Sequence, residues 1–322
     1  MKDHVIGVLG LGSIGMRHAR NLLALNCDVI GFDPDQASCD RLVAGGGLAV
    51  ADRQAVIEAA EAVVIATPNG SHADDLAAVI GAGRSVFAEK PLAHSDADIA
   101  GLLENAAAKG ITVFAAFMLR YHPVVERMRM LIDGGAVGQV WGLRAVCGSW
   151  LPGWRPAQDY RLGYAADPVT GGVINDIVHE IDLACHLLGY GRVASCVARR
   201  SGLLDMESED VADLVLVHES GASSNLHLDY LARPPVRRGS GSGSQGTLVY
   251  DLNARTLCHL DADGAEQESM ATPGAWADDY VAEMRDFLDC LGGLSSPRCD
   301  GIEALQVLTT TLQARSMAGL PQ

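Results

Sequence analysis

Lys90 follows an apolar run, Val86-Phe87-Ala88, and then Glu89, and it stands directly before Pro91. It is one of only three lysines in a chain of 322 residues that uses arginine for nearly all of its positive charge. Lysine can release its proton where water is excluded, whereas arginine effectively cannot. Lys90 is therefore a candidate for proton transfer. The alternative is a structural lysine that ends a strand and pairs with Glu89.

A second set of titratable residues lies between Thr170 and Asp182, where Asp176, His179 and Glu180 are three and four residues apart. On one helix these side chains share a face. A carboxylate beside an imidazole orients the ring and favours its protonated form, so His179 is a candidate proton acceptor. A structural histidine surrounded by acids is the alternative.

A glycine motif connects an apolar strand pattern, Val5–Leu9, with a helical pattern: Gly10-Leu11-Gly12-Ser13-Ile14-Gly15. Its glycines allow a tight turn, close approach of a pyrophosphate, and close packing of helix on strand. Asp33, eighteen residues beyond Gly15, stands at a strand end, where a carboxylate binds ribose hydroxyls and repels a 2′-phosphate. The pattern predicts a dinucleotide site that favours NAD over NADP, although Arg17 or Arg53 could hold an added phosphate. A glycine turn without a ligand is the alternative.

Two further segments follow strand patterns: Thr67-Pro68-Asn69, with His72 just beyond it, and Glu89-Lys90. Ligands bind outside the carboxyl ends of parallel strands, so both segments are expected to border the cofactor. His72 could instead be exposed in the first turn of a helix. The predicted dinucleotide contacts are Gly10, Gly12, Ser13, Ile14, Gly15, Asp33, Thr67, Pro68, Asn69, His72, Glu89 and Lys90.

A hydride-accepting cofactor and proton-handling side chains together predict the oxidation of a secondary alcohol, or the reduction of the matching ketone. The predicted catalytic residues are Lys90, His179 and Asp176. Lys90 and His179 can each take the hydroxyl proton, and their spacing does not decide which one does.

An aromatic loop at residues 149–164 is expected to contact the substrate. Its tryptophan and tyrosine rings offer flat faces for sugars, and Arg155 and Arg161 offer forks for an anionic group. A polyol or an acid-bearing sugar would fit such a loop. An interface or core loop is the alternative, since aromatic residues are common there too.

The first 120 residues alternate strand and helix patterns, which predicts an α/β domain with a doubly wound parallel sheet. The expected strands are Val5–Leu9, Val29–Phe32, Ala62–Ala66, Ser85–Glu89 and Ile111–Ala115. The expected helices are Ile14–Leu25, Gln54–Ala60, Ser71–Ala82 and Ser95–Lys109.

Residues 121–322 are predicted to form a second α/β domain with an open, mainly antiparallel sheet. The expected strands are Val140–Ser149, Val193–Ser201, Val211–His218, Ser223–Leu231, Thr247–Asp251 and Thr256–Asp261. The expected helices are Pro123–Asp133, Gly172–Leu188, Asp279–Leu291 and Gly301–Met317. The Gly-Ser run at 239–244 is typical of a flexible segment and is expected to be a mobile loop.

Composition excludes several classes of partner. The net charge of −16 and the pI near 4.9 argue against nucleic acid and anionic membranes, which are bound through excess Lys and Arg. Eight cysteines show neither close pairs nor zinc-type spacing, so we expect reduced thiols, no metal site and a cytoplasmic location. No signal-peptide pattern or membrane-spanning apolar run is present in the sequence.

Taken together, these motifs resemble those of the Gfo/Idh/MocA oxidoreductases, the group that contains glucose-fructose oxidoreductase and inositol dehydrogenase. The resemblance covers nearly the whole chain, through GLGSIG, ATPNGSH, FAEKP, LRYHP at Leu119–Pro123 and GGVINDIVHEID. It implies a Rossmann domain and a second domain whose sheet often assembles homodimers or homotetramers. It also implies that Lys90 contacts substrate and nicotinamide, and that the bond to Pro91 can be cis. The substrate contacts predicted with it are Lys90, Arg120, Trp154, Arg155, Tyr160, Arg161, Tyr164, Asp176 and His179.

Two departures from the family pattern stand out. Many members place the helix acid four residues before the histidine, where this chain has Asn175, and Asp176 is three before it. A subgroup with an Asp-x-x-His-Glu pattern, often associated with surface-polysaccharide and unusual-sugar pathways, is more similar. The Gly-Ser run also replaces a strand that is usually more apolar.

The main hypothesis is an NAD-dependent dehydrogenase that acts on a secondary hydroxyl of a sugar, sugar derivative or cyclitol. One alternative is a glycosidase of the same fold that retains NAD and uses transient oxidation. The other is a non-catalytic dinucleotide-binding regulator, which needs neither Lys90 nor His179.

Overall fold

The structure, a computed structural model, describes residues 4–156 and 158–321. These residues form two compact units. The first unit runs to Met118 and resumes over Trp276–Leu308, and the second holds Leu119–Ala275 and the residues from Thr309 onward. The sequence placed both closing helices in the second domain, whereas the chain returns to the first unit at Trp276.

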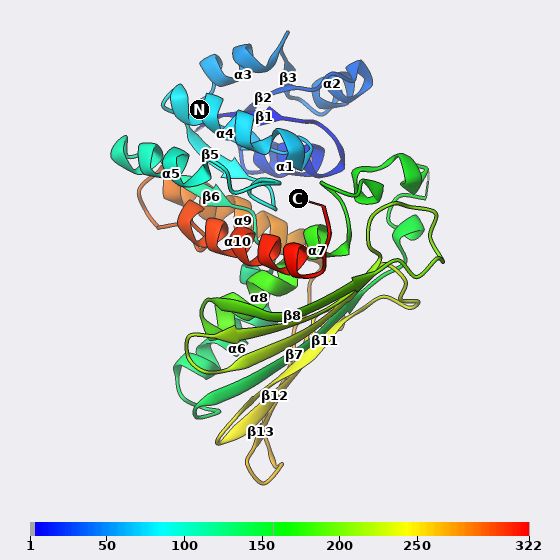
Figure 1. Cartoon of the computed structure of the whole chain (residues 1–322). Coiled ribbons are helices and arrows are strands. Elements are labelled where there is room, and N and C mark those ends of the chain that lie inside the picture. Colours follow the sequence, from blue (N-terminus) through cyan, green and yellow to red (C-terminus); the bar gives the residue numbers. More distant parts are fainter. Residues whose placement is uncertain (1–3, 157, 322) are drawn as a thin grey trace. The chain divides into compact units, whose positions relative to one another are not determined.

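The first unit contains a six-stranded sheet in the order β3-β2-β1-β4-β5-β6, and every pairing in it is parallel (Figure 1). The predicted doubly wound sheet is confirmed. The strand order reverses between β1 and β4, which is where sheets of this kind bind ligands. The strands are β1 (Val5–Leu9), β2 (Asp28–Phe32), β3 (Leu48–Ala49), β4 (Ala62–Ile65), β5 (Ser85–Ala88) and β6 (Val113–Ala115).

Helices flank this sheet, and two of them come from late in the chain. The helices from the first part are α1 (Ser13–Ala24), α2 (Gln36–Ala44), α3 (Arg53–Ala59), α4 (His72–Gly81) and α5 (Ile99–Ala108). Helix α9 (Trp276–Leu291) packs on α1, and α10 (Gly301–Met317) follows it. Helix α5 begins four residues later than the expected Ser95, because Ser95 Oγ accepts the N–H of Ala97 in a turn (3.2 Å).

Aromatic packing explains why α9 belongs to the first unit. The ring of Phe287 lies edge-on to Phe87 of β5 and Phe114 of β6, with centroid separations of 5.3 and 5.6 Å. All three side chains are fully buried, and burying one phenylalanine contributes about 1.5–3 kcal/mol. Asp300 also forms an isolated bridge with Phe114.

The second unit contains an eight-stranded sheet in the order β14-β13-β12-β11-β7-β10-β9-β8. Its pairings are antiparallel except for that between β7 and β10, so the expected mainly antiparallel sheet is confirmed. Helices α6 (Pro123–Asp133) and α8 (His179–Leu188) pack against this sheet. The strands are β7 (Val140–Gly148), β8 (Gly191–Arg199), β9 (Val211–His218), β10 (Ser223–Asp229), β11 (Val236–Gly243), β12 (Gly246–Asp251), β13 (Thr256–Asp261) and β14 (Glu266–Ala271).

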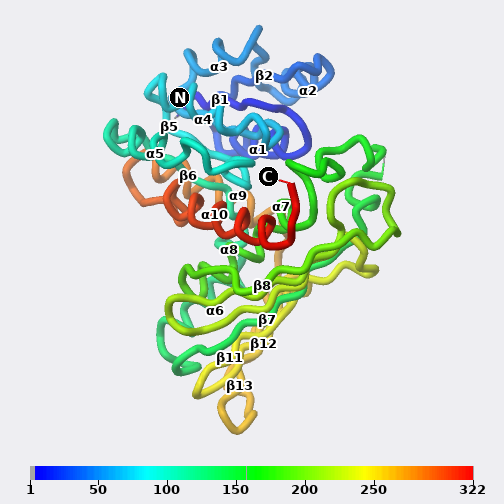
Figure 2. The backbone as a smooth tube through the Cα atoms, in the orientation of Figure 1, coloured from blue at the N-terminus to red at the C-terminus, as the bar shows by residue number. Residues whose placement is uncertain are grey.

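The expected mobile loop at residues 239–244 is wrong. Most of this run lies in β11, between β7 and β12 (Figure 2). A Cβ at Gly239 would lie 2.0 Å from the carbonyl oxygen of Arg144 and 2.5 Å from the hydroxyl of Tyr250. The missing side chain lets neighbouring strands approach closely, so glycine here serves packing and not mobility.

Candidate active site

The three motif glycines occupy three different environments at the start of α1. A Cβ on Gly10, whose φ is +83°, would lie 2.6 Å from the carbonyl oxygen of Ala66. A Cβ on Gly15 would lie 1.9 Å from the carbonyl oxygen of Gly10. At Gly12, the N-cap of the twelve-residue helix, a Cβ would meet nothing within 4 Å. Two glycines therefore serve packing, and the third leaves open space at a helix N-terminus, where a pyrophosphate fits.

Asp33 follows β2 and fixes the glycine loop while keeping free acceptor capacity. One carboxylate oxygen accepts the N–H of Leu11 at 2.7 Å, and the other accepts the N–H of Asp35 at 2.8 Å. A carboxylate offers about four acceptor positions, so the ribose hydroxyls of NAD can still bind. The two arginines that could have held a 2′-phosphate lie elsewhere: Arg17 stacks over the ring of Tyr280 at 4.4 Å, and Arg53 pairs with Asp75 at 2.7 Å.

His72, the first residue of α4, is buried with 1% exposure, so the alternative of an exposed helix start does not hold. Its Nε2 lies 2.8 Å from the carbonyl oxygen of Thr67, and its Nδ1 lies 2.9 Å from that of Pro91. The hydroxyl of Thr67 donates to Asp75 at 2.6 Å. The ring thus connects the loops after β4 and β5. Direct contacts from Thr67, His72 and the intervening Pro68 and Asn69 to the dinucleotide stay predictions.

Lys90 lies half-buried after β5, and its bond to Pro91 is cis. Glu89 is buried, and its Oε1 lies 2.7 Å from Nε2 of His18 while its Oε2 accepts the N–H of Lys90 at 3.1 Å. Burial raises the pKa of Glu89, but the hydrogen bond and charge of His18 and the charge of Lys90 outweigh burial and hold that pKa below its usual value. An ionised carboxylate therefore stands beside Lys90. The sequence did not single out His18, since nothing in the helical pattern distinguishes it from a surface histidine.

In the second unit, the expected helix Gly172–Leu188 is broken into α7 (Val173–Asp176) and α8, which begins at His179. Asp176 therefore lies in α7, whereas Glu180 and Asp182 lie in α8 with His179. Glu180 accepts a hydrogen bond from Arg237 at 2.7 Å, and Asp182 accepts one from Arg120 at 2.7 Å. Each of these two acids thus pairs with an arginine of its own.

Asp176 accepts a hydrogen bond of 2.6 Å from the hydroxyl of Tyr230. Tyr230 is fully buried, and burial, followed by the charge of Asp176, raises its pKa well above the usual value. Tyr230 therefore remains a proton donor to Asp176. The ring of Trp154 lies edge-on to that of Tyr230, with centroids 5.5 Å apart, which connects the aromatic loop to the helix acid. His179 is partly exposed beside these groups in the chain.

The arginines predicted to bind substrate are engaged in contacts within the unit. Arg120 has a side chain with 1% exposure in its ion pair with Asp182, an arrangement typical of a structural residue. Arg161 pairs with Asp159 at 2.6 Å, which raises the pKa of the guanidinium. Arg155 lies 5.9 Å from the ring centre of Tyr164.

Further hydrogen bonds connect the aromatic loop to neighbouring residues. The indole N–H of Trp154 donates to Ser149 Oγ at 2.7 Å, and the hydroxyl of Tyr160 accepts the N–H of Asp205 at 3.0 Å. Trp154 and Tyr164 remain 42% and 40% exposed. These rings are open to a ligand, and substrate contact by them and by the loop arginines stays a prediction.

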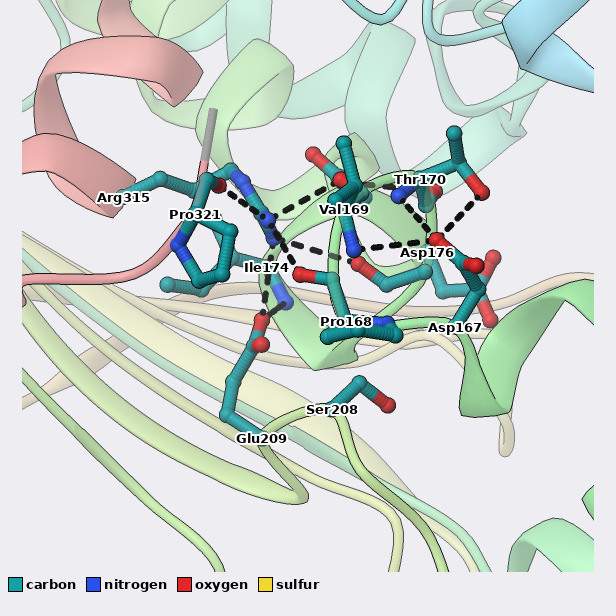
Figure 3. A network of polar contacts seen from close by, with 12 residues as sticks. Asp167, Pro168, Val169, Thr170, Ile174, Asp176, Ser208, Glu209, Arg315 and Pro321 are labelled. Atoms are coloured by element: carbon teal, nitrogen blue, oxygen red, sulfur yellow. Dashed lines mark hydrogen bonds and ion pairs between the residues drawn. The ribbon is translucent and has the colours of Figure 1, made fainter.

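A buried arginine fixes the segment that leads into α7 (Figure 3). Arg315 of α10, with 1% exposure, lies 3.6 Å from Oε1 of Glu209, which accepts the N–H of Ile174 at 3.1 Å. Asn175 donates to the carbonyl of Gly171 at 2.9 Å. Arg315 also donates at 2.8–3.1 Å to the carbonyl oxygens of Pro168, Val169, Gly171 and Pro321. The start of α7 is thereby held from both sides.

Within residues 4–156 and 158–321, no group of three or more His, Cys, Asp or Glu side chains could hold a metal ion. None of the described helices is long and apolar enough to cross a membrane. The eight cysteines are free thiols.

Comparisons with known proteins agree with this geometry. Residues 5–117 match the oxidoreductase family with an NAD-binding Rossmann fold, and residues 125–249 match the GFO/IDH/MocA C-terminal domain. Myo-inositol 2-dehydrogenase of Thermotoga maritima is 30% identical, over 94% of this chain and 92% of its own. The chain belongs to the GFO/IDH/MocA oxidoreductase family. The family resemblance, the dehydrogenase class and the use of NAD are thereby confirmed.

Other relatives of this GFO/IDH/MocA protein include cyclitol and sugar dehydrogenases. Inositol 2-dehydrogenase 2 of Saccharopolyspora erythraea is 30% identical over 78% of this chain and 72% of its own. A levoglucosan dehydrogenase, solved with NADH and levoglucosan, shares the fold with a TM-score of 0.89 at 18% identity, over 98% of this chain and 97% of its own.

Proposed function

We propose that this enzyme transfers hydride between NAD and a secondary hydroxyl, or the matching ketone, of a sugar, sugar derivative or cyclitol. The observation that carries the proposal is the place of Lys90, at the carboxyl end of β5 in the NAD-binding unit, next to the ionised carboxylate of Glu89. Its relatives named as inositol 2-dehydrogenases support a polyhydroxylated substrate.

NAD, when bound, accepts the hydride at its nicotinamide ring. The side chains must orient the substrate hydroxyl and remove its proton. The amine of Lys90 offers hydrogen-bond donors, and in this proposal it donates to the substrate oxygen. An imidazole nitrogen of His179 takes the hydroxyl proton, because a neutral imidazole accepts protons near pH 7. Asp176, held by Tyr230, orients the substrate in the second unit.

A ligand screen tests this function. Thermal stability is measured with NAD and a panel of cyclitols, sugars and sugar nucleotides, beginning with myo-inositol, and stabilising compounds are assayed for NADH absorbance. Lys90→Met is expected to lower kcat about 100-fold or more while NAD still binds, as loss of a proton-handling group does. Lys109→Met is the matched control, because Lys109 ends α5, where it donates to the carbonyl of Ile80. Turnover without net NADH, or full activity of Lys90→Met, would contradict the proposal.

We also propose that the open face of the second sheet joins copies of the chain into a homodimer or homotetramer. On that sheet, Val197 and Val249 are 64% and 44% exposed, although strand valines usually favour burial. Light scattering after size exclusion tests this assembly. Val249→Asp is expected to shift the protein toward the monomer, and a monomeric wild-type protein would exclude the assembly.

A further inference from the structure

Two buried histidines lie on either side of Lys90 in the first unit. His18 of α1 is fully buried and contacts Glu89, the residue before Lys90, at 2.7 Å. His72 of α4, with 1% exposure, contacts the carbonyl oxygen of Pro91, the residue after it, at 2.9 Å. Neither histidine is adjacent to Lys90 in the chain, but one contacts the residue before it and the other contacts the residue after it.

The contact of His18 with Glu89 fixes both partners. The His18 ring lies edge-on to Phe87, with centroids 4.9 Å apart, so packing sets its orientation. Its Nδ1 has no hydrogen-bond partner among the described residues, so the ring reaches Glu89 through Nε2. This hydrogen bond fixes Glu89, whose second oxygen holds the N–H of Lys90. A buried carboxylate without such a donor is costly and takes up a proton instead.

The contacts of His72 fix the other side. Both of its ring nitrogens lie within 2.9 Å of carbonyl oxygens, those of Thr67 and Pro91. Carbonyl oxygens only accept hydrogen bonds, so a ring nitrogen that carries a proton donates to the loop that it contacts. The ring therefore ties the backbone after Lys90 to the loop after β4. With the backbone held on both sides, only the torsions of the Lys90 side chain determine where its amine points.

We propose that His18 and His72 are positioning residues for Lys90, His18 acting through Glu89 and His72 through Pro91. The inference rests on the proposed role of Lys90 in the reaction. Catalytic groups lose efficiency when the surrounding side chains do not hold them, and these two rings supply that support from helices on the same unit.

The first test uses the protein without substrate or cofactor. With only three lysines, mass spectrometry resolves the acylation rate of Lys90 from that of Lys109, the internal reference. His18→Leu is expected to raise the Lys90-to-Lys109 ratio about threefold or more, because Glu89 loses the donor that fixes it and no longer holds the N–H of Lys90 in place. His18→Gln, which keeps an N–H donor, is expected to restore the wild-type ratio. An unchanged ratio in His18→Leu overturns the inference.

Two further variants keep this test decisive. His4→Gln removes an exposed histidine that pairs with Glu61, and it is expected to leave the ratio unchanged. If His18→Leu does not fold, Glu89→Gln replaces it, because the amide keeps the shape of the side chain and removes the charge. Glu89→Gln must then raise the ratio, and failure to do so overturns the inference.

The second test uses the enzyme with NAD and an active substrate. His18→Leu and His72→Leu are each expected to lower kcat about tenfold or more, as misplacement of a catalytic group does, with little change in KM for NAD. A raised KM for NAD with unchanged kcat would instead make His72 a cofactor contact and overturn its positioning role. If the wild type oxidises no alcohol, the proposed function fails, whereas the acylation result still decides the role of His18.

Discussion

Replacing Arg315 with methionine should strongly destabilise the second unit. The guanidinium is 1% exposed and makes four hydrogen bonds, to the carbonyl oxygens of Pro168, Val169, Gly171 and Pro321. Methionine has a similar volume and offers no donor, so all four carbonyl groups would lose this partner. Hydrogen bonds to a charged donor contribute about 1.5–3 kcal/mol each and do not add fully.

The ion pair of Arg315 with Glu209 contributes much less. Its shortest N–O distance is 3.6 Å. Burial raises the pKa of Glu209 and lowers that of Arg315, and in each case the partner's charge only partly offsets the burial. Both groups are thus shifted toward their neutral forms, which means that attraction does not compensate the loss of water. The carbonyl contacts, and not the pair, keep Arg315 in place.

These magnitudes predict an asymmetry between the two partners. Arg315→Met should lower the free energy of unfolding by about 3–5 kcal/mol, because four carbonyl groups lose a charged donor worth about 1.5–3 kcal/mol each and these losses do not add fully. Glu209→Gln should change it by about 1 kcal/mol or less, since its Oε1 can still accept the N–H of Ile174. Arg41→Met serves as the control: its guanidinium is 53% exposed and 3.8 Å from Asp35, so the expected change is below about 1 kcal/mol.

Urea denaturation followed by circular dichroism measures all three variants. A raised carboxyl pKa gives stability that is present at low pH and is lost as the pH rises through the folded-state pKa. The wild type should therefore lose stability between pH 4.5, the usual value for Glu209, and neutral pH, and Glu209→Gln should not. Equal costs for Arg315→Met and Glu209→Gln would refute the reasoning, because they would make the ion pair the main interaction.

Three further predictions concern residues around the candidate site. Tyr230→Phe, which removes the hydrogen bond to Asp176, should lower kcat about tenfold in steady-state assays, and an unchanged kcat would exclude a role for that bond. The lowered pKa of Glu89 gives stability that is present above pH 4.5 and is lost as the pH falls through the folded-state pKa. The difference in unfolding free energy between wild type and Glu89→Gln should therefore disappear on acidification. A difference that stays constant with pH would contradict this. Gly172→Ala should lower the stability measured by thermal unfolding by about 3 kcal/mol or more, because its Cβ would lie 2.2 Å from the buried carboxylate of Glu209. Gly202 is the control, since it has a similar φ of +79° and nothing within 4 Å of its Cβ position. Gly202→Ala should cost about 1 kcal/mol.

The parallel sheet could be predicted because each buried strand is apolar on both faces. The glycines of the motif could be predicted because the turn that they form is a local structure. β1, β4 and β5 carry four or more consecutive buried or nearly buried residues, a pattern visible without knowledge of their neighbours. The glycine motif also follows from a local requirement, the turn between β1 and α1. Fold class and cofactor are therefore set by short stretches of sequence.

The errors arose where distant residues override a local pattern. Helical spacing predicted one continuous helix over Gly172–Leu188, but the chain is broken between α7 and α8, and Arg315, 144 residues further along the chain, binds the carbonyl of Gly171 before α7. The Gly-Ser run predicted flexibility, but its neighbours in the sheet require residues without side chains. The helix that begins at Trp276 was assigned to the second domain by its place in the chain. Its Phe287 packs instead on Phe87 and Phe114, in strands of the first unit.

The candidate site shows the same difference between local patterns and contacts with distant residues. Spacing identifies Lys90 and His179 as groups that can handle protons, but it does not decide which one accepts the proton. That choice depends on partners far away in the chain: His18 and Glu89 are 71 residues apart, and Asp176 and Tyr230 are 54 apart. The hydrogen bond and charge of His18 help to hold the pKa of Glu89 below its usual value, although burial raises it, so Lys90 stands beside a carboxylate. Such contacts are visible only in the folded structure, so proton acceptance by His179 stays a proposal that the variants of Lys90 and His18 test.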